Sequence, residues 1–262
     1  MADRIRVTQD DGFTTGRVFS RAFGTIAANP LAALGIAFLF NALPSEAYEY
    51  ASDRLVTTSP VEVLALAKAF VLMASGTFFA ALANGGFVRL AVAHDAGRRP
   101  SFVEALRAGG QSLLPLIAVG LIIGVGTTIG LILLIVPGIF LSLMWAVAGA
   151  VLVDEQCGPI AALGRSRTLT EGVWGAIFGI GIVTGLAAAL FLYVTLRLAG
   201  DLTGSAADTI KLVQPSILYL SIELLVTTIA AAVSAAVYTS LYVELRNWKH
   251  GTPEDALAEV FA

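Results

Sequence analysis

The longest uncharged segment of the chain constrains its fold most. Residues 108–153 form a run of 46 positions without an acidic residue, a basic residue or a histidine. A helix crosses the hydrocarbon core of a membrane in about 20 residues, so this run is long enough for two crossings. Proline ends a helix and glycine permits a tight reversal. The run therefore predicts helices at about 112–134 and 137–153, with the turn at Pro137 and Gly138.

The composition supports a membrane protein. Hydrophobic residues make up 57% of the chain and charged residues 13%, whereas soluble domains carry about 25% charged residues. Lipid must therefore solvate much of the surface. The first crossing contains two interruptions, Asn41 and Pro44. That first crossing is expected at about 29–51, and the other three crossings outside the uncharged run are expected at about 61–92, 172–198 and 215–246.

These segments predict one all-α domain, a polytopic bundle of six transmembrane helices. Its parts are an N-terminal region at 1–28, the bundle at 29–246 and a tail at 247–262. Lysine and arginine concentrate in cytoplasmic loops of membrane proteins. Twelve of them fall in segments assigned to the cytoplasm and three on the other side, with Lys68 near a membrane boundary. Both termini are therefore expected in the cytoplasm.

A short segment precedes each odd-numbered crossing, and each has an apolar face interleaved with arginine. These segments are 13–28, 101–109 and 159–169. The second begins with Ser101 and Glu104, which match a capping box. The pattern predicts amphipathic helices in the cytoplasmic interface. It is consistent with a diverged three-fold repeat, and equally with the amphipathic character that loops near membranes generally have.

Pairs of glycines four residues apart occur on two predicted crossings. Such spacing lets helix backbones approach closely, which favours packing, although it also suits the lining of a flexible pathway. The pairs are Gly120 with Gly124, Gly126 with Gly130, Gly175 with Gly179, and Gly181 with Gly185.

Two intramembrane charges, Lys68 and Glu223, lie at similar heights. Counted from Arg89 and Arg246, each is about 32–35 Å along its helix, near the outer edge of the hydrocarbon. They are expected to pair, or else to snorkel independently to the interface. Glu223 belongs to a polar stripe that should face protein or a water-filled cavity. The stripe comprises Ser216, Tyr219, Glu223, Thr227, Ala230, Ser234 and Tyr238.

A second group of polar residues follows the fourth crossing. Asp154 and Glu155 precede a predicted helix that carries Arg165, Ser166 and Arg167. One interpretation is that the acids and arginines form local ion pairs and complement the helix dipole. The other is that Arg165, Ser166 and Arg167 contact lipid phosphates at the cytoplasmic leaflet.

The sequence predicts no catalytic, cofactor or metal site. Its histidines, His94 and His250, lie at expected cytoplasmic boundaries, and the single cysteine, Cys157, follows the fourth crossing. No metalloprotease, phosphate-loop, nucleophile-elbow or dinucleotide motif occurs. The expected partners are membrane lipids and a possible protein in the membrane, without nucleic acid because no basic tract is present. The oligomeric state stays open.

The region 133–175 resembles the membrane domain attached to some glycerophosphodiester phosphodiesterases and the related YciC-type inner-membrane proteins. Residues 241–261 resemble the end of the same family, whereas Gly164 departs from its usual basic or larger residue. The residues that carry the resemblance are Pro137, Gly138, Glu155, Ala162, Leu163, Ser166, Leu169 and Gly172.

The resemblance implies a six-helix fold in the bacterial inner membrane. It does not imply phosphodiesterase activity, because that chemistry belongs to a separate soluble domain. The leading hypothesis is a non-enzymatic protein of envelope or lipid homeostasis, or a membrane partner protein. The alternative is a small-solute transporter or channel lined by the polar stripe. A third hypothesis is a membrane-embedded lipid enzyme that uses Asp154 or Glu155 as an acid or base.

Overall fold

The computed structural model describes residues 13–47, 62–203 and 217–250, and every regular element within these ranges is helical. Six helical segments there are long and apolar enough to cross a membrane. The predicted all-α bundle with six membrane spans is therefore confirmed. The spans are Pro30–Ala47, Ser75–Asp95, Leu113–Leu133, Ile135–Glu155, Trp174–Phe191 and Leu220–His250.

Short helices precede the first, third and fifth spans, where the sequence predicts them. The Ser101 Oγ accepts a hydrogen bond from the Glu104 N–H at 3.2 Å, which is one of the two bonds of a capping box, while the Glu104 carboxylate accepts from Arg89. Proline begins the third of these helices, where its missing N–H removes no helical hydrogen bond. The predicted helices are thus present, and their position in a lipid interface stays a prediction. They are α1 (Thr15–Ala28), α5 (Phe102–Gln111) and α9 (Pro159–Thr170).

The first span changes its winding where the sequence predicts interruptions. It begins as α2 (Pro30–Ala37), passes through the π-helix η1 (Phe38–Ala42) and continues as helix to residue 47. Pro44 has no N–H to donate to the preceding turn, and the wider π turn accommodates that loss. Asn41 lies within the π turn.

The third and fourth spans form a hairpin of α6 (Leu113–Leu133), α7 (Ile135–Met144) and α8 (Ala148–Glu155). The chain reverses at Leu134, so the turn predicted at Pro137 and Gly138 is placed too late. Pro137 instead belongs to the first turn of α7, where proline is tolerated. Gly138 permits close packing, because an added Cβ would lie 2.6 Å from the Leu131 backbone nitrogen.

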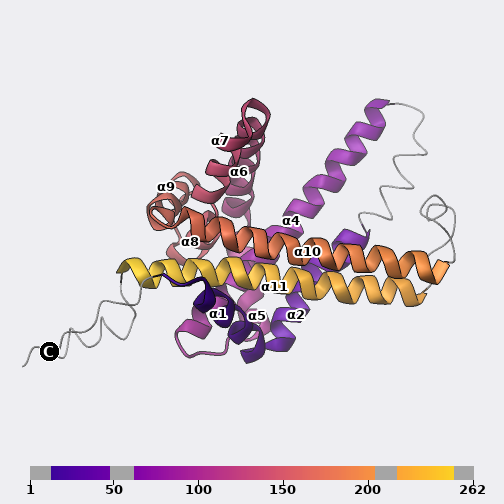
Figure 1. Cartoon of the computed structure of the whole chain (residues 1–262), viewed down its shortest axis with the longest axis horizontal. Coiled ribbons are helices and arrows are strands. Elements are labelled where there is room, and N and C mark those ends of the chain that lie inside the picture. The colour runs from indigo at the N-terminus through magenta and orange to yellow at the C-terminus, as the bar shows by residue number, and fades with distance from the viewer. Residues whose placement is uncertain (1–12, 48–61, 204–216, 251–262) are drawn as a thin grey trace, which may run out of the picture.

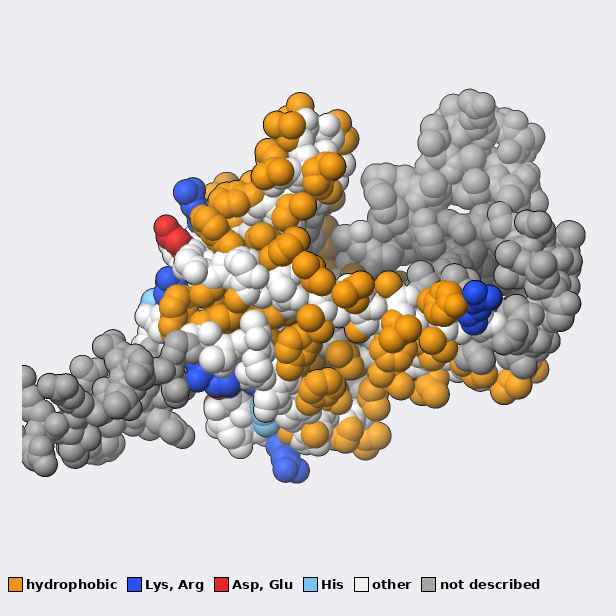
Figure 2. All heavy atoms as spheres, viewed as in Figure 1, with side chains coloured by type: hydrophobic (Ala, Val, Ile, Leu, Met, Phe, Trp, Pro, Cys, Tyr) orange, Lys and Arg blue, Asp and Glu red, His pale blue; other side chains and the backbone are white. Residues whose placement is uncertain are grey.

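Three helices exceed the length that a membrane requires. Figure 1 shows α10 and α11 side by side, while the hairpin of α6 and α7 projects away from them. Apolar side chains cover much of the face in Figure 2. Helices of 30 or 34 residues must tilt or extend into water. The three are α4 (Glu62–Asp95), α10 (Trp174–Thr203) and α11 (Ile217–His250).

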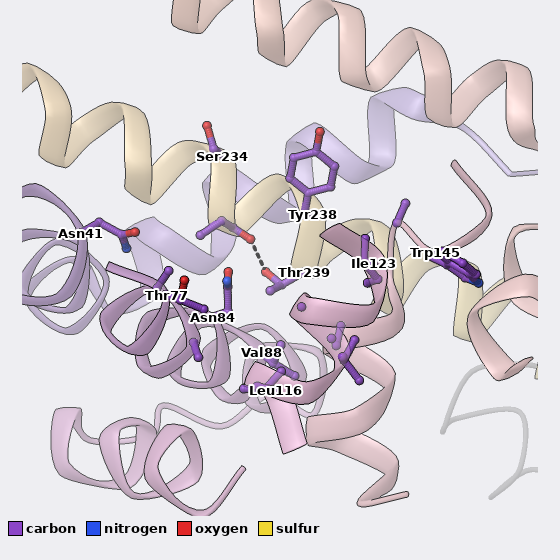
Figure 3. A pocket seen from close by; sticks show the side chains of 18 of the residues that line it. Asn41, Thr77, Asn84, Val88, Leu116, Ile123, Trp145, Ser234, Tyr238 and Thr239 are labelled. Atoms are coloured by element: carbon purple, nitrogen blue, oxygen red, sulfur yellow. Dashed lines mark hydrogen bonds between the residues drawn. The ribbon is translucent and has the colours of Figure 1, made fainter. Parts of the chain in front are cut away.

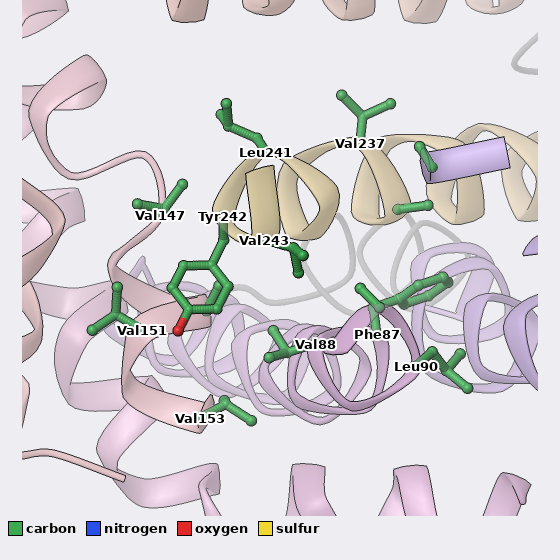
Figure 4. Close-up of a cluster of buried hydrophobic side chains, with 14 of the residues drawn as sticks. Phe87, Val88, Leu90, Val147, Val151, Val153, Val237, Leu241, Tyr242 and Val243 are labelled. Carbon is green, nitrogen blue, oxygen red and sulfur yellow. The ribbon is translucent and has the colours of Figure 1, made fainter. Parts of the chain in front are cut away.

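The best-packed part of the bundle is the end at which α4, α8 and α11 finish, here called the charged end. Figure 4 shows apolar side chains from these helices packed together there. The side chains of Phe87 of α4, Val151 of α8 and Leu241 of α11 are fully buried. Val18 and Ala22 of α1 belong to the same buried cluster. The short helix α1 is therefore part of the folded core.

The glycine pairs serve packing only in part. An added Cβ at Gly130 would lie 2.8 Å from Gly138, and one at Gly126 would lie 2.8 Å from the Trp145 ring. At the other predicted positions an added Cβ would meet no atom of the described chain within 4 Å. These are Gly120, Gly124, Gly175, Gly179, Gly181 and Gly185.

Candidate functional site

A cavity of about 480 Å³ lies among η1, α4, α6, α8 and α11, and we call it the cleft (Figure 3). Its walls are mostly aliphatic and aromatic, with Leu116, Val119, Ile123 and Trp145 contributed by α6 and by the segment joining α7 to α8. Polar side chains from three elements also line it. They are Asn41, Thr77, Asn84, Ser234, Tyr238 and Thr239.

Four of these polar groups lack a partner in the described part of the chain. The amides of Asn41 and Asn84 and the hydroxyls of Ser234 and Tyr238 form no side-chain hydrogen bond with described residues, whereas the Thr239 hydroxyl donates to the Ala235 carbonyl at 2.8 Å. An unpaired amide or hydroxyl in an apolar medium costs about 1–3 kcal/mol. Asn84 and Tyr238 are exposed and Asn41 and Ser234 are half-buried, so these groups are accessible to water or to a polar part of a ligand that enters the cleft.

The predicted polar stripe of α11 contributes only its second half to the cleft. Ser234 and Tyr238 line the cleft, whereas Glu223 and Thr227 are half-buried elsewhere on the same helix. The side chains of Lys68 and Tyr219 and the whole of Ser216 lie outside the described residues. The pairing of Lys68 with Glu223 stays a prediction.

Sequence reasoning missed the contribution of α4. Thr77, Asn84 and Val88 are spaced by seven and four residues, which places them on one helical face. Two polar residues at that spacing on an apolar helix are the signal that could have identified this wall. Asn41 drew attention only as an interruption of the first span.

A network of buried ion pairs closes the charged end. Arg246 of α11 donates to Asp95 of α4 at 3.0 Å and to Asp154 of α8 at 2.6 Å. The Tyr242 hydroxyl also donates to Asp154, at 2.7 Å, and the Asn247 amide donates to Asp95 at 3.2 Å. One arginine therefore joins three helices that are distant in sequence.

The same network incorporates α1. Arg21 pairs with Asp95 and, at 3.5 Å, with Glu244, while Arg17 donates to Glu244 at 2.5 Å. The carboxylates of Asp95 and Glu244 are only 7% and 5% exposed. Buried charges persist when they are paired and hydrogen-bonded, and here both carboxylates have at least two donors. The network thus fixes the position of α1 against α4 and α11.

The polar residues predicted as one group after the fourth span, 154–155 and 165–167, make different kinds of contact in the structure. Glu155 accepts from Arg165 at 3.1 Å, which confirms the local ion pair. Asp154 turns instead into the network, a contact that sequence spacing did not reveal. Ser166 is fully buried and donates to the Met144 carbonyl at 2.9 Å, where it satisfies an end of α7. Ser166 is therefore not accessible to a lipid headgroup, whereas contact of Arg165 and the exposed Arg167 with lipid phosphates stays a prediction.

The Cys157 thiol is poorly suited to nucleophilic chemistry. Burial raises the pKa of the Cys157 thiol above its ordinary value, and the nearby Glu155 charge adds to this effect. Thiolate is the reactive form, so the thiol is a weak nucleophile at neutral pH. Among residues 13–47, 62–203 and 217–250, no cluster of three His, Cys, Asp or Glu side chains is arranged to bind a metal ion.

No family model matches the chain. No solved structure matches it either. The fold and the cleft define its class, an all-helical protein with six spans suited to a membrane.

Proposed function

We propose that this chain is a non-enzymatic protein of the bacterial inner membrane that binds a membrane amphiphile in the cleft and acts in envelope lipid homeostasis. The observation that carries the proposal is the combination of apolar walls with the unpaired polar groups of Asn41, Asn84, Ser234 and Tyr238. Ligand sites are typically apolar cavities with a few polar groups that orient the ligand. The resemblance to YciC-type proteins agrees with this proposal and remains part of it.

An amphiphile fits the cleft better than a solute that passes through the bundle. The ion-pair network joins α1, α4, α8 and α11 at the charged end, where the carboxylates of Asp95 and Glu244 are almost fully buried and that of Asp154 is half-buried. A continuous path for a small solute would have to open that network. Transport is the second candidate, and the position of Ser234 and Tyr238 in the cleft favours it.

The proposed binding of an amphiphile in the cleft can be tested with a substitution that fills the cleft. Gly120 lines the cleft and Gly124 does not, although both are on α6 and an added Cβ at either meets nothing within 4 Å. Gly120→Phe is expected to weaken binding of one phospholipid at least about tenfold, which corresponds to roughly 1.4 kcal/mol. Gly124→Phe is the matched control and should bind lipid as the parent does.

Trp145 provides the readout because its ring lines the cleft. In a Trp174→Phe, Trp248→Phe background, phospholipid with brominated chains is titrated into delipidated protein in detergent. Saturable quenching near one lipid per protein supports the proposal. Quenching that is unsaturable, or equal in both glycine variants, contradicts it. The transport candidate requires instead that proteoliposomes swell in an osmotically active solute and that Gly120→Phe stop the swelling.

The orientation of the protein is part of the proposal, with the charged end and both termini in the cytoplasm. It rests on the twelve-to-three distribution of lysine and arginine. In a Cys157→Ser background, cysteines introduced at positions 3 and 252 should react with an impermeant maleimide only from the cytoplasmic side. A cysteine at position 205 should react only from outside. Reaction of position 205 from the cytoplasm would overturn the topology.

A further inference from the structure

A second cavity, of about 270 Å³, lies at the charged end between α4, α5 and α8, and we call it the polar pocket. Its lining differs from that of the cleft because charged and amide side chains dominate it. Those that carry the argument are Arg89, Glu104, Arg107, Gln111, Ser112 and Asp154.

The charges of the polar pocket balance, yet three of its polar groups remain available. Arg89 donates to Glu104 Oε1 at 2.5 Å, and Asp154 Oδ2 receives Tyr242 and Arg246. Among the described residues, no donor reaches Glu104 Oε2 or Asp154 Oδ1, and the Arg107 guanidinium has no hydrogen bond or ion pair. Within the described part of the chain, the pocket therefore offers one free cation, the exposed Arg107, and two free carboxylate oxygens.

Glu104 retains its charge in this setting. The hydrogen bond from Arg89 is the main cause that lowers the pKa of Glu104 below its ordinary value, and the charges of Arg89 and Arg98 act in the same direction. The carboxylate is therefore ionised at neutral pH. It keeps one oxygen engaged with Arg89 and presents the other to a ligand.

The polar pocket adjoins the cleft. Val88 of α4 lines both cavities. On α6, Leu116 lines the cleft, and Ser112, one helical turn earlier at the start of that helix, lines the polar pocket. A polar compartment at the charged end thus borders an apolar compartment farther along the spans. This arrangement matches the headgroup and the chains of a phospholipid.

We propose that the polar pocket binds the headgroup of a phospholipid with a primary amine, whose acyl chain enters the cleft. Arg107 pairs with the phosphate, which also accepts from the Gln111 amide and the Ser112 hydroxyl. The ammonium donates to Asp154 Oδ1 and Glu104 Oε2. This inference deepens the proposed amphiphile binding and rests on it.

The balance of charges in the polar pocket is the reason why we expect it to prefer a headgroup with a primary amine over other phospholipid headgroups. A headgroup with one phosphate and one ammonium is neutral and supplies a partner of opposite sign to each free group. An anionic headgroup without the amine leaves both carboxylate oxygens unpaired, and a trimethylated amine has no N–H to donate to them. Loss of the hydrogen bonds to these charged groups is expected to weaken binding roughly 10- to 100-fold.

The test compares three brominated phospholipids with identical chains, namely phosphatidylethanolamine, phosphatidylcholine and phosphatidylglycerol, by quenching of Trp145 in the background defined above. Phosphatidylethanolamine is expected to bind at least about tenfold more tightly than either of the others. Arg107→Gln should weaken binding of all three about tenfold, since each has the phosphate. Arg99→Gln, an exposed neighbour outside the pocket, is the control and should change nothing.

The outcomes separate the two proposals. Equal affinity for the three headgroups would overturn the headgroup site and leave amphiphile binding intact. Absence of saturable quenching by every lipid would remove both. Soluble glycerophosphoethanolamine carries the same phosphate and amine without chains, so it should displace the lipid only at far higher concentration. Displacement at equal concentration would assign the pocket to a soluble compound and contradict the lipid assignment.

Discussion

Replacement of Arg246 by methionine is expected to lower the free energy of unfolding by about 3–5 kcal/mol, the usual cost of breaking a buried ion pair. Arg246 is the shared partner of Asp95 and Asp154, whose side chains are only 7% and 19% exposed. Methionine fills similar volume but leaves both carboxylates short of a cation. The measurement is unfolding in mixed micelles with increasing SDS, followed by circular dichroism.

Two further variants make this result specific to the network. Arg98→Met removes a 3.5 Å pair from an exposed arginine, and it should cost less than about 1 kcal/mol. Arg246→Met combined with Asp154→Asn should lose less stability than the sum of the two single changes, because the second change removes a stranded charge. Additive losses would show that Asp154 does not depend on Arg246.

Replacement of Gly109 by alanine is expected to cost about 1–3 kcal/mol through overpacking. An added Cβ at Gly109 would lie 2.5 Å from the Leu82 carbonyl oxygen, and one at Gly85 would lie 2.5 Å from the Gly109 Cα. These contacts involve backbone atoms, so α5 must move away from α4. The polar pocket between the two helices should then widen, with weaker lipid binding as a second readout.

Gly110 supplies the control for this change. It is the next residue of α5, and an added Cβ there meets nothing within 4 Å. Gly110→Ala should leave stability unchanged or raise it by up to about 1 kcal/mol, since alanine is the better helix former. The same SDS titration compares the two variants. Equal behaviour of Gly109→Ala and Gly110→Ala would contradict the close approach of α4 and α5.

Local sequence patterns were sufficient for the elements of this fold. The uncharged run at 108–153 predicts two spans, and Ser101 with Glu104 predicts the start of α5, because hydropathy and capping depend on neighbours within a few residues. The errors were small and local. The reversal at Leu134 precedes Pro137 because proline is tolerated in the first turn of a helix, so it marked the start of α7 and not the turn itself.

The sequence by itself determined that the chain is an all-helical membrane protein with six spans, and it placed Ser234 in a polar stripe and Asp154 in a polar group after the fourth span. Only the tertiary structure decided that Ser234 lines the cleft and that Asp154 pairs with Arg246. Arg246 lies 92 residues from Asp154 and 151 from Asp95, and their contact depends on how α4, α8 and α11 pack at one end. Helix packing between distant segments is set by the fit of whole surfaces, which residue spacing within one helix does not encode.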